Sequence, residues 1–374
     1  MAPFCRKLQA ICNSGYGLRQ TMTTNVSVFD GHNDVLLRLY KSKSTNAVSD
    51  FLAGEEAGHI DLKKARAGSF VGGLFAMYSP STGNFASLGQ RMTGGQYALP
   101  LPAPLPMEEA RKSVLGELAI LMRIIRASQG AVALCKTTAE VNAAIRRGAL
   151  AVVLHLEGAE AIDADLHFLE LLYAAGLRSL GPVWSRNNIF GHGVPFQFPG
   201  GPDIGDGLTA AGEKLVSACN EMKILVDLSH ITEKGFWDVA RLSKAPLVAT
   251  HSNAHALCPS PRNLTDKQLA AIRDSGGMVG LNFATCFLRS DGGMNADTDI
   301  ELMVRQLDYL IEKLGEDHVG FGSDFDGATV PAKIGSAVGL PVLIASLRQS
   351  GYSEPLLKKL GTANWLNVLE RTIG

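Results

Sequence analysis

The stretch Val28-Phe29-Asp30-Gly31-His32-Asn33-Asp34 decides how the rest of the chain is interpreted. It ends a short apolar run of residues that favour strands, and it places His32 and Asp34 two residues apart. Side chains at positions i and i+2 of a strand point to the same face. An imidazole and a carboxylate would therefore share one face at the end of a buried strand. Taken alone, this pair fits either a solvated strand end or half of a metal site, and the choice depends on whether the rest of the chain supplies the other half.

Seven further apolar runs follow this one, and helical patterns lie between many of them. The eight predicted strands are residues 27–30, 70–78, 150–157, 179–184, 224–230, 247–251, 278–283 and 319–324. Apolar residues at helical spacing predict helices at 107–128, 164–176, 209–221, 234–242, 265–275 and 299–314. Strands that alternate with helices indicate parallel βα units, and eight units predict an α/β fold of the (β/α)8 TIM barrel type. An open doubly wound sheet is the alternative, but no G-x-G-x-x-G follows the first strand, which disfavours its dinucleotide-binding form.

Capping residues mark several helix ends in the sequence. Thr209, Thr232 and Thr265 precede helical runs and are N-cap candidates, while Gly176 and Gly315 stand at expected C-terminal ends. In the helix predicted at 107–128, the acidic residues, Glu117 included, are assigned to the polar face. The Gly- and Pro-rich segments 79–106 and 190–208 are expected to be long loops on the strand-exit side, where barrel enzymes build their sites.

Length and charge narrow the class of protein. The 374 residues suffice for one large core. The 35 basic side chains are balanced by 36 acidic ones, so the composition does not indicate a basic surface for nucleic acid. Six scattered cysteines suit a reducing compartment. No apolar run is long enough to span a membrane, and no continuous apolar segment marks a secretion signal. We therefore expect a cytoplasmic protein without membrane or nucleic-acid partners, with residues 1–24 as a poorly ordered extension and residues 25–374 as a single catalytic barrel domain.

Polar residues cluster at the C-terminal ends of the predicted strands. They are His32, Asp34, Glu157, His230, His251 and Asp324. In a barrel these ends converge on one mouth, so a scatter of unrelated side chains is a poor explanation. Imidazole and carboxylate ligands suit Zn²⁺. Five ligands exceed the three of a one-metal catalytic site, so we expect two ions bridged by Glu157 and a water or hydroxide, with Asp324 left as acid or base.

Simpler readings exist for each histidine taken singly. A buried histidine is more often a core or supporting residue than a metal ligand, and only the shared strand-end position argues against that reading here. His155 shares a strand face with Glu157. It can fill the barrel core, orient Glu157 from behind, or bind metal.

These residues resemble the membrane dipeptidase (renal dipeptidase) family of zinc peptidases, and in particular its soluble bacterial-type members. The matching stretches are Asp30-Gly31-His32-Asn33-Asp34, Leu156-Glu157-Gly158, Val226-Asp227-Leu228-Ser229-His230, Thr250-His251-Ser252-Asn253, Pro261-Arg262-Asn263-Leu264 and Gly322-Ser323-Asp324-Phe325-Asp326-Gly327. They run in family order over about residues 28–370. The resemblance implies an amidohydrolase-like barrel with a binuclear zinc site. In it His32 and Asp34 hold one zinc, His230 and His251 hold the other, and Glu157 bridges them.

The resemblance also implies roles in substrate binding. Asp324 would handle the substrate amino group and proton transfer, and Arg262 would grip the substrate carboxylate, for which a guanidinium fork is suited. Trp184 stands where animal members carry a substrate-contacting histidine. Its indole N–H, His192 or the metal would then stabilise the oxyanion. A homodimer is expected by resemblance alone.

The expected function is hydrolysis of dipeptides with free amino and carboxyl termini, by attack of a metal-bridging hydroxide. The nearest alternative is another metal-dependent hydrolase of the amidohydrolase type, acting on an amide, a lactam or a phosphoester. A non-catalytic, metal-binding barrel protein is the alternative from a different class.

Overall fold

The computed structural model describes residues 25–42, 44, 46–81 and 91–374, and its centre is a barrel of parallel strands. The barrel strands are β1 (Val28–Asn33), β2 (Phe70–Tyr78), β5 (Leu150–Glu157), β6 (Leu177–Gly181), β8 (Leu225–Val226), β9 (Val248–Ala249), β10 (Met278–Asn282) and β11 (Val319–Gly322). Their order is β8-β6-β5-β2-β1-β11-β10-β9. The two ends meet where Asp227 bridges Val248 in parallel and the Leu228 N–H donates to the Val248 carbonyl over 2.9 Å. The predicted (β/α)8 barrel is confirmed.

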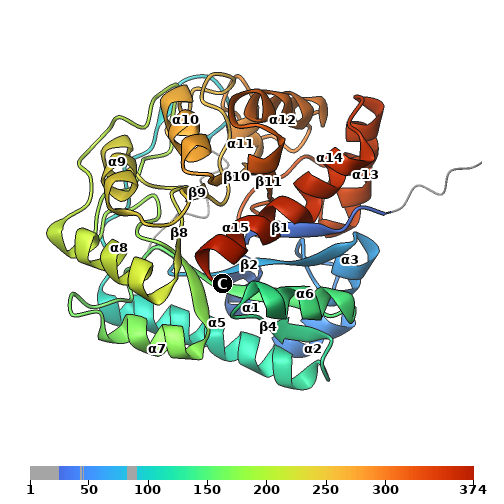
Figure 1. The fold of residues 1–374 in the computed structure, drawn as a ribbon, viewed down its shortest axis with the longest axis horizontal. Helices are drawn as coiled ribbons and strands as arrows, with labels where there is room; N and C mark the ends of the chain where they lie inside the picture. Colours follow the sequence, from blue (N-terminus) through green and yellow to red (C-terminus); the bar gives the residue numbers. More distant parts are fainter. Residues whose placement is uncertain (1–24, 43, 45, 82–90) are drawn as a thin grey trace, which may run out of the picture.

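Helices surround this barrel, as Figure 1 shows. They are α1 (Val35–Lys41), α2 (Ala47–Ala53), α3 (Leu62–Ala67), α5 (Met107–Ala127), α6 (Thr138–Arg146), α7 (His167–Ala175), α8 (Ala210–Met222), α9 (Glu233–Leu242), α10 (Asp266–Asp274), α11 (Thr285–Leu288), α12 (Glu301–Leu314), α13 (Leu340–Gln349), α14 (Glu354–Lys358) and α15 (Asn364–Thr372). Short 3-10 turns occupy Glu316–His318 and Ala337–Gly339, and a π turn, Lys359–Ala363, leads into α15. In the described part of the chain, no helix is both long and apolar enough to cross a membrane.

The predicted caps explain where several helices begin and end. The hydroxyls of Thr209, Thr232 and Thr265 each accept a hydrogen bond from a backbone N–H in the first turn of α8, α9 and α10. Such caps satisfy N–H groups that have no partner within the helix. Gly176 and Gly315 end α7 and α12 with φ angles of 121° and 88°. These five predictions are confirmed.

Helix α15 closes the N-terminal end of the barrel. Trp365 is fully buried and donates its indole N–H to the Phe321 carbonyl over 2.9 Å. It packs in one apolar cluster with inward side chains of the barrel strands, among them Phe29, Leu74 and Val153. In Figure 1, α15 and the C-terminus lie near the centre of the view, among the strands. With this end filled, only the opposite end, where the strands exit, is available for a site.

Gly31, inside the opening stretch, leaves room for this plug. A Cβ built on Gly31 would lie 2.3 Å from the Trp365 ring and 2.4 Å from the Thr250 carbonyl oxygen. Both distances are well below any normal contact, so a side chain at this position would displace either the plug or the β9 exit. Residue 31 must therefore be a glycine, because the backbone next to His32 packs closely against Trp365, which forms the floor of the barrel.

Several features of the fold differ from the sequence-based expectations. The long segments 79–106 and 190–208 pair with each other, through an antiparallel bridge of β3 (Tyr97–Ala98) with β7 (Gln197–Phe198), and β4 (Val132–Leu134) adds to the start of β5. The assignment of Glu117 to the polar face of its helix is wrong. Its side chain is fully buried and accepts a hydrogen bond from the Tyr78 N–H over 3.0 Å, at the end of β2.

Candidate active site

Strand β5 delivers Glu157 to the barrel mouth by simple alternation. Val153 belongs to the apolar cluster inside the barrel, whereas Leu154 and Leu156 belong to the core outside it. His155 and Glu157 follow Val153 on the inner face. His155 fills the layer below Glu157, where its Nδ1 lies 2.8 Å from the Ser179 hydroxyl. Of the three roles open to His155, this position supports filling the core beneath the mouth.

Strand β1 brings in His32 and Asp34. The pairing of β1 with β2 shifts register between Asp30 and Asn33, so simple alternation breaks down there. The His32 ring stacks on the His251 ring with 3.8 Å between centroids, which places it inside the barrel. Asp34 lies just past the strand, and its Oδ2 is 3.3 Å from His32 Nε2. The pair predicted from the sequence is therefore adjacent in space.

His230 and His251 come from the exits of β8 and β9 and face Glu157. Their Nε2 atoms are 3.1 Å apart, and they lie 2.9 Å and 3.5 Å from Glu157 Oε1. Each Nδ1 is occupied, by the Ser185 hydroxyl at 3.0 Å for His230 and by the Thr250 hydroxyl at 2.8 Å for His251. A partner on Nδ1 orients the ring and leaves Nε2 available to a ligand.

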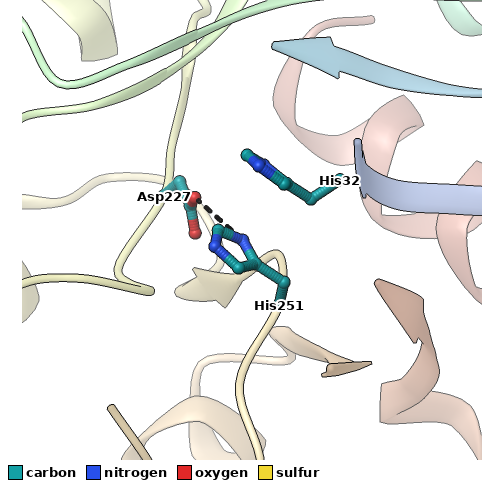
Figure 2. Close-up of side chains that lie close together, drawn as sticks. All are labelled: His32, Asp227 and His251. Carbon is teal, nitrogen blue, oxygen red and sulfur yellow. Dashed lines mark ion pairs between the residues drawn. The ribbon is translucent and has the colours of Figure 1, made fainter. Parts of the chain in front are cut away.

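Asp227 supports the His251 side of the site from behind. It accepts hydrogen bonds from the Thr250 backbone N–H at 2.8 Å and from the Thr250 hydroxyl at 2.7 Å. Its carboxylate also lies 3.9 Å from His251 Nδ1, the contact dashed in Figure 2. The same figure shows His32 pointing from β1 toward this pair. The exits of β8 and β9 are thus tied together just where the two histidines emerge.

Burial and neighbouring charges perturb the acid–base behaviour of the whole cluster. Burial raises the pKa of Glu157 well above its ordinary value and lowers the pKa values of His230 and His251 well below theirs. Burial also acts to lower the pKa of His32, but the carboxylates of Glu157 and Asp34 outweigh it and raise that pKa to about 10. The buried carboxylates of Glu157 and Asp34 therefore favour a positive charge between them.

These residues fit bound metal ions. The sets His32, Asp34, Glu157 and Glu157, His230, His251 each present one ligand atom per residue, all within 4.8 Å of one another, and Glu157 belongs to both. Within the described residues, Nδ1 of the fully buried His32 has no hydrogen-bond partner, and its Nε2 faces the carboxylates of Asp34 and Glu157 at 3.3 and 3.7 Å. A buried polar atom without a partner is costly, and coordination to a cation would satisfy it.

Asp324 sits beside this cluster in a constrained loop. Its backbone φ of 57° lies in the left-handed region that non-glycine residues seldom adopt. Hydrogen bonds hold it there: its N–H donates to the His32 carbonyl over 3.1 Å, and its Oδ2 accepts from the Asn282 amide over 2.9 Å. Burial raises the pKa of the Asp324 carboxyl. Uncommon backbone geometry of this kind persists only where surrounding contacts enforce it.

A second set of contacts joins the Asp324 loop to the helix after Asp34. Asp326 accepts a hydrogen bond from the His59 N–H over 2.6 Å, and its Oδ1 lies 3.1 Å from Arg38 Nε. Arg38 is on α1, one turn beyond Asp34. The exits of β1 and β11 are therefore linked by side chains as well as by the sheet.

The other two predicted substrate-binding residues have different settings. Arg262 is almost fully buried and donates to the His251 carbonyl over 3.2 Å and to the Ser252 hydroxyl over 3.4 Å. Its guanidinium carbon lies 5.3 Å from the centre of the Phe287 ring. Trp184 lies beyond β6, and its ring centroid is 5.9 Å from that of His230.

A cavity of about 270 Å³ opens beside this cluster. Asp34, Glu157, Trp184, His230 and Asp324 all line it, whereas the buried side chains of Arg262, His32 and His251 do not. His192, an alternative to Trp184, instead bonds to the Gly207 carbonyl and is not among the lining residues. A larger and more open groove of about 830 Å³ lies between α1, α2 and α5 and contains none of these side chains. We therefore take the smaller cavity as the candidate active site.

Several supporting residues were not found from the sequence. Asp30 accepts from the Ser323 N–H over 2.6 Å and from the Ser323 hydroxyl over 2.8 Å, which ties β1 to the β11 exit. Burial raises the pKa of Asp30 to about 7. Asp30 stands in the opening stretch, and a carboxylate inside a buried strand is itself a signal that a hydrogen-bond partner is nearby. Asn282 and Arg38 carry no comparable local signal.

Comparisons with known proteins show the family of this chain. A model of the membrane dipeptidase family, peptidase family M19, matches residues 18–373. A solved metallo peptidase from Rhodobacter sphaeroides, liganded with a phosphinate mimic of the dipeptide L-Ala-D-Ala, is 54% identical with a TM-score of 0.91, and the match covers 93% of this chain and 99% of that one. An uncharacterized protein in the pqqA 5′ region of Klebsiella pneumoniae is 53% identical over 254 residues, which are 68% of this chain and 94% of the relative. Dipeptidase ataJ of Aspergillus terreus is 27% identical over 379 residues, covering 94% of this chain and 86% of the relative.

Proposed function

The chain belongs to the membrane dipeptidase family of metallo-dipeptidases, and from this premise we propose that it is a zinc-dependent hydrolase of dipeptides with free termini. The observation that carries the proposal is Glu157, which is shared by two sets of ligand residues at one barrel mouth. On this proposal His32 and Asp34 hold one zinc ion, His230 and His251 hold the second, and Glu157 contacts both. When bound, the two ions supply an activated water and polarise the scissile carbonyl.

Asp324 is proposed to bind the substrate amino group and to carry a proton to the leaving amine. It lines the cavity, and Asn282 occupies its Oδ2, so Oδ1 is the oxygen available to a substrate. A cationic amine beside a buried carboxylate makes a strong, charge-assisted hydrogen bond. The fixed loop holds the carboxylate at one place, as proton transfer to a positioned group requires.

Arg262 is proposed to attract the substrate carboxylate from behind the cavity wall. Its two bonds to the exit of β9 use both terminal nitrogens, and within the described residues its Nε has no hydrogen-bond partner. A buried cation without a carboxylate in direct contact favours an incoming anion. Recognition of both substrate termini would limit the enzyme to short substrates, because a longer peptide lacks one of the two charges at the required place.

We further infer that a D-residue is accepted at the C-terminal position. Support comes from the Rhodobacter sphaeroides relative, which was solved with a mimic of L-Ala-D-Ala and is 54% identical to this chain. Trp184 at the cavity wall is the proposed neighbour of the developing oxyanion, through its indole N–H.

A panel of substrates tests the proposal. The purified protein, assayed with zinc, is expected to cleave L,L- and L,D-dipeptides but not N-acetylated or C-amidated versions of them. Asp324→Asn should lose turnover while metal analysis still finds two ions per chain, and Arg262→Lys should narrow the difference between free and amidated substrates. Cleavage of lactams or phosphoesters without any dipeptide cleavage would assign the protein to another hydrolase class. Bound zinc with no turnover of any substrate would indicate a non-catalytic barrel.

A further inference from the structure

The candidate active-site cavity is lined by two unlike groups of side chains. Carboxylates form one group: Asp34, Glu157, Asp324 and Asp326. The other group is apolar or aromatic, and we call it the aromatic wall: Tyr78, Met92, Trp184, Phe196, Phe287 and Met294. Among the described lining residues, Lys41 is the only one with a formal positive charge. The proposed metal centre and amine contact account for Asp34, Glu157 and Asp324, but apart from Trp184 the residues of the aromatic wall have no task in that proposal.

The aromatic wall is continuous and begins at a proposed metal ligand. Its ring centroids are separated by 5.1 Å from Tyr78 to Trp184 and by 5.5 Å from Trp184 to Phe196. Phe196 then stacks on Phe287 with 6.3 Å between centroids. The Trp184 ring also approaches the His230 ring, with 5.9 Å between centroids. Side chains of a substrate bound at the metal centre would therefore come close to this surface.

Buried contacts hold the start of the wall in place. Arg186 is fully buried, and its guanidinium lies 5.8 Å from the centre of the Tyr78 ring and 5.5 Å from that of Trp184. The same guanidinium donates to Glu160 over 3.0 Å and to the Ser79 carbonyl over 2.9 Å. An arginine fixed at several points and in contact with two rings restrains their positions.

Three separate loops are joined to form the rest of the wall. The Leu99 N–H donates to the Phe196 carbonyl over 2.9 Å, next to the β3–β7 bridge. The Met294 N–H donates to the Met92 carbonyl over 2.6 Å. Trp184, Phe196 and Met294 nevertheless remain half-exposed, so the wall is not simply a sealed core. A fixed apolar surface that stays open to a cavity is the usual form of a small-molecule subsite.

We propose that the aromatic wall is a side-chain subsite, and that the enzyme prefers dipeptides with a bulky apolar side chain at one of their two positions. This rests on the proposed dipeptidase function. Apolar substrate atoms would leave water on contact with the wall, which favours binding. An acidic side chain would lose its hydration on contact with the apolar wall and is expected to be rejected. Glycine would leave the wall in contact with water.

Two dipeptide series test the subsite in the wild-type protein. One series places Gly, Ala, Leu, Phe and Glu at the N-terminal position, and the other places them at the C-terminal position. In one series kcat/KM should rise from Gly to Leu by at least about 10-fold, because a single methylene in an apolar pocket is already worth about 10- to 200-fold. Glu should be the poorest substrate of that series. Similar kcat/KM values across both series would overturn the subsite while leaving dipeptidase activity established. No cleavage in either series would overturn the proposed function and the subsite together.

A matched pair of variants locates the effect. Phe196→Ala should lower the Leu-to-Gly ratio of kcat/KM by about 10-fold or more. Ile204→Ala is the control, because Ile204 lies in the same loop, is 37% exposed and does not line the cavity. Its Leu-to-Gly ratio should match that of the wild type. If Phe196→Ala keeps the wild-type ratio, or if both variants change it equally, the aromatic wall is not the subsite. The milder Phe196→Leu serves if the alanine variant does not fold.

Discussion

Substitution of Gly327 by alanine should damage the active site through a single methyl group. A Cβ built on Gly327 would lie 2.0 Å from Asp34 Oδ2 and 2.6 Å from Asp324 Oδ1. Real Cβ contacts essentially never fall below 3.0 Å, so the Asp34 oxygen must move by about 1 Å, the difference between 3.0 and 2.0 Å. A displacement of this size at a catalytic centre costs about 100-fold in rate. We expect kcat/KM for a good dipeptide to fall by about that factor.

The same variant separates an effect on the site from an effect on folding. Gly327 lines the cavity and its φ lies outside the left-handed region, so alanine strains no backbone angle and the thermal midpoint should stay close to that of the wild type. Zinc should bind more weakly, which titration with a chelator measures. Gly201→Ala is the control, because its Cβ would meet only His255 Nε2, at 3.8 Å. If Gly327→Ala keeps wild-type activity and zinc affinity, the placement of Asp34 and Asp324 given above is incorrect.

Two further predictions concern stability. Trp365→Ala removes the barrel plug and should lower the free energy of unfolding by about 3–5 kcal/mol, seen as a lower denaturation midpoint. Trp365→Phe should lose much less. Equal midpoints for the alanine variant and the wild type would contradict the role of the plug. Burial raises the pKa of Glu117 well above its ordinary value, so the folded state retains a proton that the unfolded chain loses, and stability should fall as pH rises above the ordinary carboxyl range. Glu117→Gln keeps an acceptor for the Tyr78 N–H and should remove this loss, so it should be more stable than the wild type at pH 8 but not at pH 4. A pH-independent difference between the two proteins would show that Glu117 is not the titrating group.

The eight barrel strands were predictable because parallel strands buried on both faces read as short, continuous apolar runs. Residues 150–157 are the clearest case: every side chain of β5 is buried, and alternation alone points Glu157 into the mouth. The positions of β8 and β9 were predictable from the sequence, but their lengths were not. Each of these strands contributes only two residues to the hydrogen-bonded ladder. Past the ends of β8 and β9, side-chain contacts such as those of Asp227 hold the segments together in place of backbone hydrogen bonds. No local sequence pattern predicts where these side-chain contacts begin.

Contacts between distant segments account for what the sequence did not reveal. Glu117 has helical neighbours that suggest a solvent-facing position, yet its partner is the end of β2, 39 residues earlier. Arg38 looks like an ordinary surface arginine until Asp326 comes to face it. The pairing of β3 with β7 joins two segments that each read as loop. In all these cases the deciding interaction depends on the closed barrel, which exists only after the strands have assembled.

The opening stretch concentrates structural and chemical tasks that are usually separate. Asp30 fixes the exit of β11, Gly31 leaves room for the Trp365 plug, and His32 and Asp34 lie at the proposed metal site. These residues are consecutive or nearly so, and strand β1 therefore connects the barrel floor directly to the barrel mouth. A side chain at Gly31 would press on the plug and on the His32 strand at once, so stability and activity cannot be changed independently there. Apart from Tyr78, which ends β2, the residues of the aromatic wall lie outside the barrel strands, and this is where specificity can vary without loss of the fold.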